Sequence, residues 1–464
     1  MEKETRSNSL EQFRDLLRDH GAAIAMRTAA SIADVRLRAA DKLLNDSDIA
    51  FPQKGEDGYE YTDLNAMFAT DMGVNVNRIP VTAAVEGLFR CGLPHLSPLL
   101  AIWINDTFRL TDRFVALKPE GVSVVAFGNA KGDDLKAIEK YYGNVAKADG
   151  NHPTTLLNTA LAQEGVLVRI GKDVSCDRPI QLVTLLKSMT APSGEELPVL
   201  ALNRLLIVME SGSRASLLLC DHDVSDRSVS AMTRVCEVVM AENSRLDLYS
   251  LEESSTECTH YTRTVCRVGA DCRLNMFYGT LHPGKTRNDI EVHLEGRGSE
   301  LNVDGLAIAD ANQLADNCAV VYHHAPHCKS FQKFKYLVRE TGKGAFEGLI
   351  RVDTGATGTE AYQNDRNILG DTGARMHSRP QLEIYCDDVK CSHGAATGQL
   401  DEKALFYMRS RGIGLDEARA MLMNAFMADV IERVQLLSLK DRLKHLVERR
   451  LSGEPVHCNE CPIE

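Results

Sequence analysis

The middle of the chain, from about residue 155 to residue 397, consists of strand-like segments with almost no helical periodicity. Runs such as Arg204–Met209, Ala215–Leu219 and Cys272–Phe277 are rich in aliphatic residues. In Ile290–Leu294, apolar and polar residues alternate, which predicts a strand with one buried face. A region of this length and texture cannot form a helical bundle, so strands must build its core.

Glycines in turn-like sequences precede many of these strand-like runs, at positions 212, 269, 298, 344 and 373. Gly269 to Gly298 and Gly344 to Gly373 each span 29 positions, and Gly212 to Gly269 spans 57, near twice that. The 46 positions from Gly298 to Gly344 break the series. Quasi-regular strands with few helices predict a solenoid in which each coil buries its face against the next. A pair of β-sandwiches is the competing architecture.

Helical patterns flank this region. Apolar residues share one face in the first fifty residues, and Val122–Phe127 adds a short strand-like run. Near the C-terminus, Asp401 can cap a helix that runs to Arg411, and Met421–Ile431 carries an apolar stripe typical of core or of a partner surface. We therefore predict an N-terminal helical region with a small β element (1–150), a β-solenoid (151–397), a C-terminal helical domain (398–453) and a tail (454–464).

Composition narrows the function classes. Lys and Arg number 53 against 65 Asp and Glu, a net charge of -12, so we expect no general binding to nucleic acid or anionic membranes. No apolar run approaches the roughly 18 residues of a membrane span, and the first residues lack the apolar stretch of a secretory signal. We expect a cytoplasmic protein whose 13 cysteines are thiols rather than disulfides.

Three motifs invite functional interpretations that their surroundings disfavour. Gly279–Thr286 matches the phosphate-binding P-loop pattern, but the strand-like Ile290–Leu294 follows where that loop needs a helix. In the segment YHHAPHC, consecutive His323 and His324 would point to opposite faces of a strand, so packed or hydrogen-bonded roles are favoured over a metal site. The tail pair Cys458 and Cys461 supplies only two of the four ligands that a structural zinc needs.

The segment from Leu382 to Gly394 is the best candidate for a site. If it is extended, Leu382, Ile384 and Cys386 share a core face. Cys391 and His393 then lie together on the other face, about 6.6 Å apart. A thiolate and an imidazole at this separation can bind one soft metal centre, although they supply only half of a four-ligand set. A surface cysteine and histidine without a role are the alternative.

The same segment carries a family resemblance. QLEIYCDDVKCSHGAATGQLDEKALFYMRSRGI, from Gln381 to Ile413, closely resembles the C-terminal signature of the SufD branch of the SufB/SufD family, which assembles iron–sulfur clusters in the SUF machinery. Further blocks resemble the family in the same order, and Tyr61–Leu64 resembles the SufD branch rather than SufB. These blocks are LNTALAQEGVLVRI (157–170), TRNDIEVHLEGRGSELNVDGLAI (286–308), YHHAPHC and AYQNDRNIL (361–369).

The resemblance implies a right-handed parallel β-helix flanked by helical regions. It also implies a SufB-like partner joined through the β-helices and SufC-type ATPase subunits docked on the C-terminal helices. By motif, His393 is a candidate ligand for a transient iron–sulfur cluster near the interface with the SufB-like subunit, and Cys391 is its neighbour there. No cofactor is expected to be tightly bound to the isolated chain, which could form a homodimer without its partner.

We therefore predict a non-catalytic scaffold subunit of an iron–sulfur cluster assembly complex, with ATP hydrolysis in a partner. Two alternatives stay open. A β-helix enzyme acting on polysaccharide would need clustered acidic or basic residues on a sheet face, whereas adjacent Asp387 and Asp388 would be split between faces. A P-loop nucleotide-binding protein would need a helix after Thr286.

Overall fold

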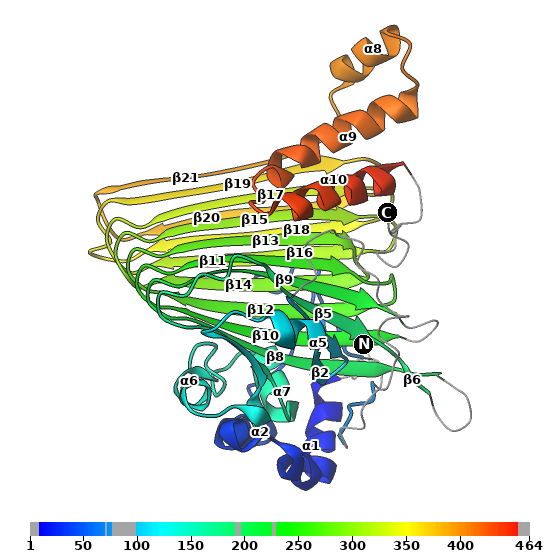
Figure 1. The fold of residues 1–464 in the computed structure, drawn as a ribbon. Coiled ribbons are helices and arrows are strands. Elements are labelled where there is room, and N and C mark those ends of the chain that lie inside the picture. The colour runs from blue at the N-terminus through cyan, green and yellow to red at the C-terminus, as the bar shows by residue number, and fades with distance from the viewer. Residues whose placement is uncertain (1–8, 70–71, 77–98, 191–195, 225–228, 453–464) are drawn as a thin grey trace.

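The computed structural model describes residues 9–69, 72–76, 99–190, 196–224 and 229–452, and it shows a mainly β protein built as a parallel solenoid of about seven coils (Figure 1). From residue 199 onward, successive strands alternate between two facing sheets, so each strand pairs with the strand two places along the chain. Because these pairs are parallel, the predicted solenoid is confirmed and the pair of β-sandwiches is wrong.

The ten-stranded sheet has the order β2 (Thr107–Leu110), β1 (Leu99–Ile104), β5 (Ile180–Leu186), β9 (Arg214–Asp223), β11 (Arg245–Glu253), β13 (Arg273–His282), β15 (Glu300–Ala309), β17 (Lys329–Val338), β19 (Thr359–Leu369) and β21 (Val389–Gly398). The nine-stranded sheet has the order β20 (Arg375–Ile384), β18 (Lys343–Val352), β16 (Leu314–His323), β14 (Lys285–Leu294), β12 (Thr259–Val268), β10 (Ser230–Met240), β8 (Val199–Met209), β4 (Val166–Ile170) and β3 (Val122–Ala126). The short strands β6 (Met189–Thr190) and β7 (Glu196–Leu197) form a separate hairpin.

The register fixes which side chains fill the interior. Lys285 pairs with Leu314, which pairs with Lys343, so a coil takes 29 residues here. Because paired residues in parallel strands point to the same side of a sheet, side chains form columns along the solenoid. The apolar core between the sheets consists of such columns, and Ile290 and Val303 are members of it. Parallel sheets covered on both faces explain the nearly continuous apolar runs of strands such as β8.

The N-terminal helices gather at one end of the solenoid (Figure 1). They are α1 (Ser9–Arg27), α2 (Ala33–Asn45), α3 (Leu64–Met67), α5 (Asp112–Leu117), α6 (Asp133–Tyr141) and α7 (Pro153–Leu161), with single 3₁₀ turns at Ala30–Ile32 and Phe127–Asn129. Leu156 and Leu157 of α7 belong to an apolar cluster with Leu200 and Tyr261 on the outer face of the nine-stranded sheet. The N-terminal β elements are not a sheet of their own, because β1 pairs with β5 and β3 pairs with β4.

The C-terminal helices divide into two parts. The helices α9 (Leu415–Ile431) and α10 (Leu437–Leu451) pack on the outer face of the ten-stranded sheet, where Met427 and Leu443 share a cluster with Tyr249 and Phe277. The helix α8 (Glu402–Ser410) has no buried residue and projects away from the solenoid (Figure 1). As predicted, Asp401 caps α8, because its carboxylate accepts from the first-turn amides.

The structure bears on two expectations from composition, the state of the cysteines and the absence of a membrane span. All ten cysteines within the described ranges are free thiols, as predicted. None of the helices in those ranges combines the length and apolar character needed to cross a membrane. Cys458 and Cys461 lie outside the described residues.

Candidate functional site

The solenoid ends in a coil that no further strand of the described residues covers. The strands β20 and β21 are the outermost strands of their two sheets, and both lie at the same end. Each is ten residues long, and most of the side chains on β21 are exposed. A strand in this position presents unpaired backbone donors and acceptors, which can pair with a strand of another chain. This end of the solenoid, formed by β20 and β21, is called the open end below.

Cys391 and His393 both lie on β21 at the open end and point to the same side of the sheet, as predicted. They pair in register with Ala361 and Gln363 of β19, which are buried in the solenoid. The expectation that they occupy the face opposite the core is therefore wrong. The chain turns between Ile384 and Val389, so alternation does not continue through it, and both side chains face the interior of an uncovered coil.

Cys391 and His393 differ in their surroundings. Cys391 is half-buried and packs, together with Cys386, against an apolar cluster that includes Ile350 and Val352. Burial raises the pKa of the Cys391 thiol, opposed by a hydrogen bond with the backbone of Ala361, so metal binding there would have to displace a proton. His393 is exposed. Its imidazole is therefore accessible as a ligand without rearrangement of the core.

Among the described residues, the ligand set at the open end is incomplete. Across the described ranges, no group of three or more His, Cys, Asp or Glu side chains is arranged to hold a metal ion. Cys391 and His393 are two ligands, and metal centres with thiolate and imidazole ligands usually have four. A centre at the open end would need its remaining ligands from outside the residues that the structure describes.

Sequence reasoning missed a polar column beneath His393. The Gln363 side chain donates to Gln332 Oε1 at 2.8 Å, in the interior of the last coils. The neighbouring Asp365 is fully buried and accepts hydrogen bonds from Ser378 of β20 and from Asn367. Burial outweighs these hydrogen bonds and raises the pKa of Asp365 to about 6. The apolar core therefore gives way to polar groups toward the open end.

The raised pKa of Asp365 predicts a specific pH dependence of stability. When folding raises the pKa of a carboxyl group, ionisation of that group destabilises the folded protein. The loss of stability begins as the pH rises above the pKa in the unfolded chain, near 3.8, and is complete above the pKa in the folded protein, about 6. Two pKa units correspond to about 3 kcal/mol. We expect Asp365→Asn to be more stable than the parent by up to about 3 kcal/mol at pH 7.5, with a much smaller difference at pH 4.5.

The measurement is the free energy of unfolding in denaturant, taken across this pH range. Asp387→Asn removes an exposed carboxylate from the turn between β20 and β21 and serves as the control. A difference between Asp365→Asn and the parent that does not change with pH would contradict the assignment.

The P-loop resemblance is a coincidence of sequence. Gly279 lies inside β13, and β14 begins at Lys285, so a strand and not a helix follows the motif, as predicted. Thr286 is fully buried in the solenoid. Backbone amides in this segment donate hydrogen bonds within the sheets and are not arranged around a phosphate.

His323 and His324 of YHHAPHC have hydrogen-bond partners, in agreement with the prediction for most residues of this segment. His323 is buried and hydrogen bonds with Ser330 at 2.8 Å. His324 points to the opposite face, where its two ring nitrogens contact Asp353 at 2.6 Å and His293 at 2.9 Å. The planes of the two imidazoles are parallel within 3°, and the short contact between their nitrogens is a hydrogen bond. Cys328 is buried.

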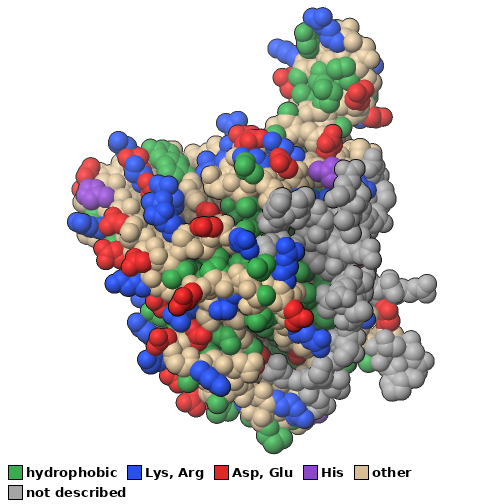
Figure 2. All heavy atoms as spheres, viewed as in Figure 1, with side chains coloured by type: hydrophobic (Ala, Val, Ile, Leu, Met, Phe, Trp, Pro, Cys, Tyr) green, Lys and Arg blue, Asp and Glu red, His purple; other side chains and the backbone are tan. Residues whose placement is uncertain are grey.

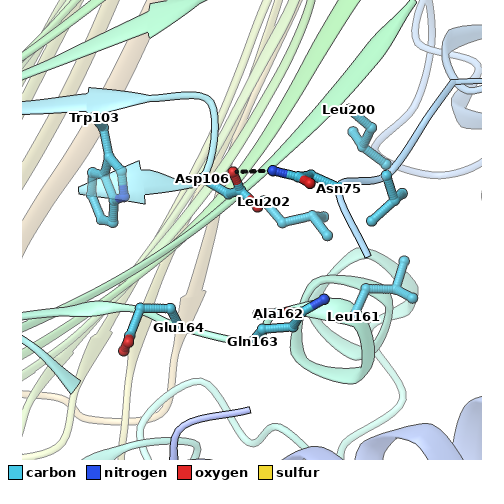
Figure 3. Close-up of a pocket in the computed structure, with 10 residues that line it drawn as sticks. Asn75, Trp103, Asp106, Leu161, Ala162, Gln163, Glu164, Leu200 and Leu202 are labelled. Carbon is cyan, nitrogen blue, oxygen red and sulfur yellow. Dashed lines mark hydrogen bonds between the residues drawn. The ribbon is translucent and has the colours of Figure 1, made fainter. Parts of the chain in front are cut away.

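A small cavity lies near the N-terminal helices, far along the solenoid from the open end (Figure 3). It measures about 20 Å³, and its walls include Trp103, Leu161 and Leu202. Asn75 donates to Asp106 across one side at 3.3 Å (Figure 3). A volume of this size holds about one water molecule, so the cavity is not a ligand site.

Comparisons with known proteins agree with the resemblance seen in the sequence. Residues 190–426 match the family model described as SUF system FeS cluster assembly, SufBD core domain, and residues 7–182 match that of the SufBD protein N-terminal region. An iron–sulfur cluster assembly SufBD family protein of Synechocystis is 26% identical over 90% of this chain and 91% of its own length. SufD of Escherichia coli is 29% identical over 64% of this chain and 69% of its own length, and SufD of Bacillus subtilis is 23% identical over 72% and 75%.

Proposed function

Because the chain belongs to the SufBD family of the SUF iron–sulfur cluster assembly system, we propose that it is a non-catalytic scaffold subunit of the assembly complex. It pairs through the open end with a SufB-like subunit, and it docks a SufC-type ATPase through its C-terminal helices. A transient cluster is built at the interface between the two solenoids. The observation that carries this proposal is the uncovered coil with half a ligand set on its inner face.

The open end supports pairing with a second solenoid. Two ten-residue edge strands lie side by side at this end, and their unpaired backbone groups can continue into the strands of another chain. Tyr385 in the turn between them is 55% exposed, which adds an apolar contact to the backbone pairing. A partner built on the same coil dimensions would match both edges at once. A second copy of this chain meets that condition too, so we propose that the isolated chain can form a homodimer.

The partner would complete the ligand set. His393 and Cys391 face into the last coil, where the first coil of an apposed solenoid would cover them. Sulfur would arrive as persulfide on the SufB-like subunit, where a two-electron reductant would release it as sulfide. The cluster would leave again as cargo rather than remain as a cofactor.

The projecting helix α8 supports docking of an ATPase. Phe406 is 76% exposed and Tyr407 is 58% exposed, and neither packs on the solenoid. Hydrophobic side chains gather on the projecting lobe in Figure 2, in the position that α8 occupies in Figure 1. Exposed aromatic side chains flanked by cations, here Lys403 and Arg409, are typical of a protein interface. Hydrolysis of ATP on the docked subunit would then act on the solenoid through α9.

The charge of the chain bears on the cellular location of the complex. An acidic chain of net charge -12 is unsuited to nucleic acid and to anionic membranes, and we propose a cytoplasmic complex.

Co-purification tests the proposal. The tagged full-length chain, co-expressed with its chromosomal neighbours, should capture a SufB-like and a SufC-like subunit, and the complex should assemble a cluster when supplied with iron and sulfide. Capture of neither subunit by a folded chain would overturn the proposal. Binding of a polysaccharide by the chain alone would favour the alternative of a β-helix enzyme.

A further inference from the structure

A hollow of about 340 Å³ lies on the outer face of the ten-stranded sheet, beside the end of α9. Its size falls at the lower end of the range of about 300–1,000 Å³ that small-molecule sites occupy. Its walls include two aromatic rings, three cations and one carboxylate, which are Phe331, Tyr362, Lys333, Arg366, Arg433 and Asp429. It lies over β17 and β19 on the outer face of the sheet, whereas His393 faces the interior, and the cluster site does not use it.

The aromatic wall consists of Phe331 on β17 and Tyr362 on β19. The rings stack at a centroid distance of 5.4 Å with planes 14° apart, and both are half-buried. Neither ring belongs to an apolar cluster of the described residues. The next position in this column is Ser392 of β21, which is too small to cover Tyr362. The aromatic ladder therefore ends at Tyr362, which lines the hollow.

The cations make the hollow positive within an acidic protein. Lys333 Nζ lies 2.7 Å from Asp429, and Arg433 binds both carboxylate oxygens of Asp304 at 2.8 Å. Arg366 is exposed and makes no ion pair or hydrogen bond with any residue in the described ranges. With Lys335, which shares Asp429, the hollow has four cations and two carboxylates around it.

The last coil leaves these groups accessible. The residues of β21 that pair with Asn364 and Arg366 are Gly394 and Ala396. Their small side chains do not cover the neighbouring strand. Positions two apart on a strand are about 7 Å apart, so Arg366 and Tyr362 lie about 13 Å apart, a span that the long arginine side chain can shorten.

We propose that this hollow binds a phosphorylated planar heteroaromatic compound of mononucleotide size. Its ring stacks on Tyr362, and its phosphate binds Arg366 and Lys333. Stacking on an aromatic side chain suits every flat heterocycle, and guanidinium binds phosphate with two parallel hydrogen bonds. This inference goes beyond the scaffold function and does not depend on it.

Calorimetric titration of the full-length chain separates the two contributions. Adenosine 5′-monophosphate should bind with submillimolar affinity, more tightly than adenosine or inorganic phosphate. Arg366→Gln should weaken binding of the monophosphate about 10-fold and leave that of adenosine unchanged. Tyr362→Leu should weaken binding of both nucleoside and nucleotide about 10-fold.

Two variants serve as matched controls for charge. Lys329→Gln removes a cation from the same face of β17 but outside the hollow, and Lys285→Ala removes one from the other sheet. Both should bind the monophosphate as the parent does. The proposal is overturned if the parent shows no saturable binding up to about 10 mM, if inorganic phosphate binds as tightly as the monophosphate, or if Arg366→Gln and Lys329→Gln have equal effects. Failure here leaves cluster assembly by the complex untouched, so the two proposals fail separately.

Discussion

A complex that contains His393→Ala should assemble clusters at least about 10-fold more slowly than the parent complex, because loss of a direct ligand costs at least as much as loss of the groups that orient one. Folding and complex formation should remain nearly intact. His393 is exposed on the uncovered coil, and changes to such side chains usually shift stability by about 0.5 kcal/mol or less. The measurement is the rate at which cluster absorbance appears after iron and sulfide are added.

Lys390→Gln is the matched control for His393→Ala. Lys390 is exposed on the same strand but points to the outer face, away from the last coil, so its loss should leave the assembly rate unchanged. A normal rate with His393→Ala would remove the ligand role. The KCSH segment would then be a structural part of the interface only.

The two cysteines of the same region distinguish a ligand from a packing group. Cys391 and Cys386 pack against the same apolar cluster, so replacement of either by serine should lower stability by a similar amount. If Cys391 is a ligand, only Cys391→Ser should also slow cluster assembly. The effect should be smaller than that of His393→Ala if the histidine is the principal ligand, and about equal if both bind.

The solenoid could be predicted from the sequence, but the spacing of the glycines gave the coil length for only some of the coils. The turns that lead into β9, β11, β13, β15 and β17 each contain one residue with positive φ, and in two of them that residue is Gly212 or Gly298. At the equivalent turns the structure has Asn243, Asp271 and His327, also with positive φ. Asparagine and aspartate adopt this conformation more easily than other side chains, so glycine spacing alone skips coils. This explains the interval of 57 residues, which contains two coils.

The orientation of the candidate site could not be predicted from alternation. Strand alternation holds only while the backbone stays extended, and the residues between Ile384 and Val389 form a turn. Cys386 and Cys391 therefore both pack against the core although their numbers differ by an odd interval. His393 is exposed because β21 is the last strand of its sheet, and no local sequence pattern indicates which strand is the last.

Two pairs of side chains that the sequence analysis did not identify meet because β17 and β19 pair in register. Gln363 and Gln332 are 31 residues apart and meet because β19 lies beside β17. Tyr362 and Phe331 stack for the same reason. Neither pair resembles a sequence motif. The two residues of each pair are one coil apart in the sequence, and this spacing can be recognised only when the coil length is known.

The C-terminal helices were predicted from their apolar stripes, but one stripe serves two purposes. Met423, Met427 and Val430 of α9 are buried on the solenoid, whereas Met421 near the start of the helix is 48% exposed. Removal of all residues from about 400 onward would therefore expose the sheet under α9 and α10, and loss of partner binding would follow from misfolding. A test of ATPase docking must leave those two helices in place and change α8 alone.

Replacement of both Phe406 and Tyr407 by glutamate should weaken capture of the SufC-type subunit at least about 100-fold, because two exposed aromatic anchors at an interface each contribute about 2 kcal/mol or more. Glutamate favours helix, so α8 should persist. Binding of the SufB-like subunit should not change, since the open end is formed by β20 and β21. Leu437→Glu, at a side chain that is 70% exposed at the start of α10, tests whether any exposed apolar residue has this effect. If the α8 double variant captures the ATPase subunit normally in a pull-down, docking lies elsewhere, and if it loses both subunits, α8 is not a separate docking element.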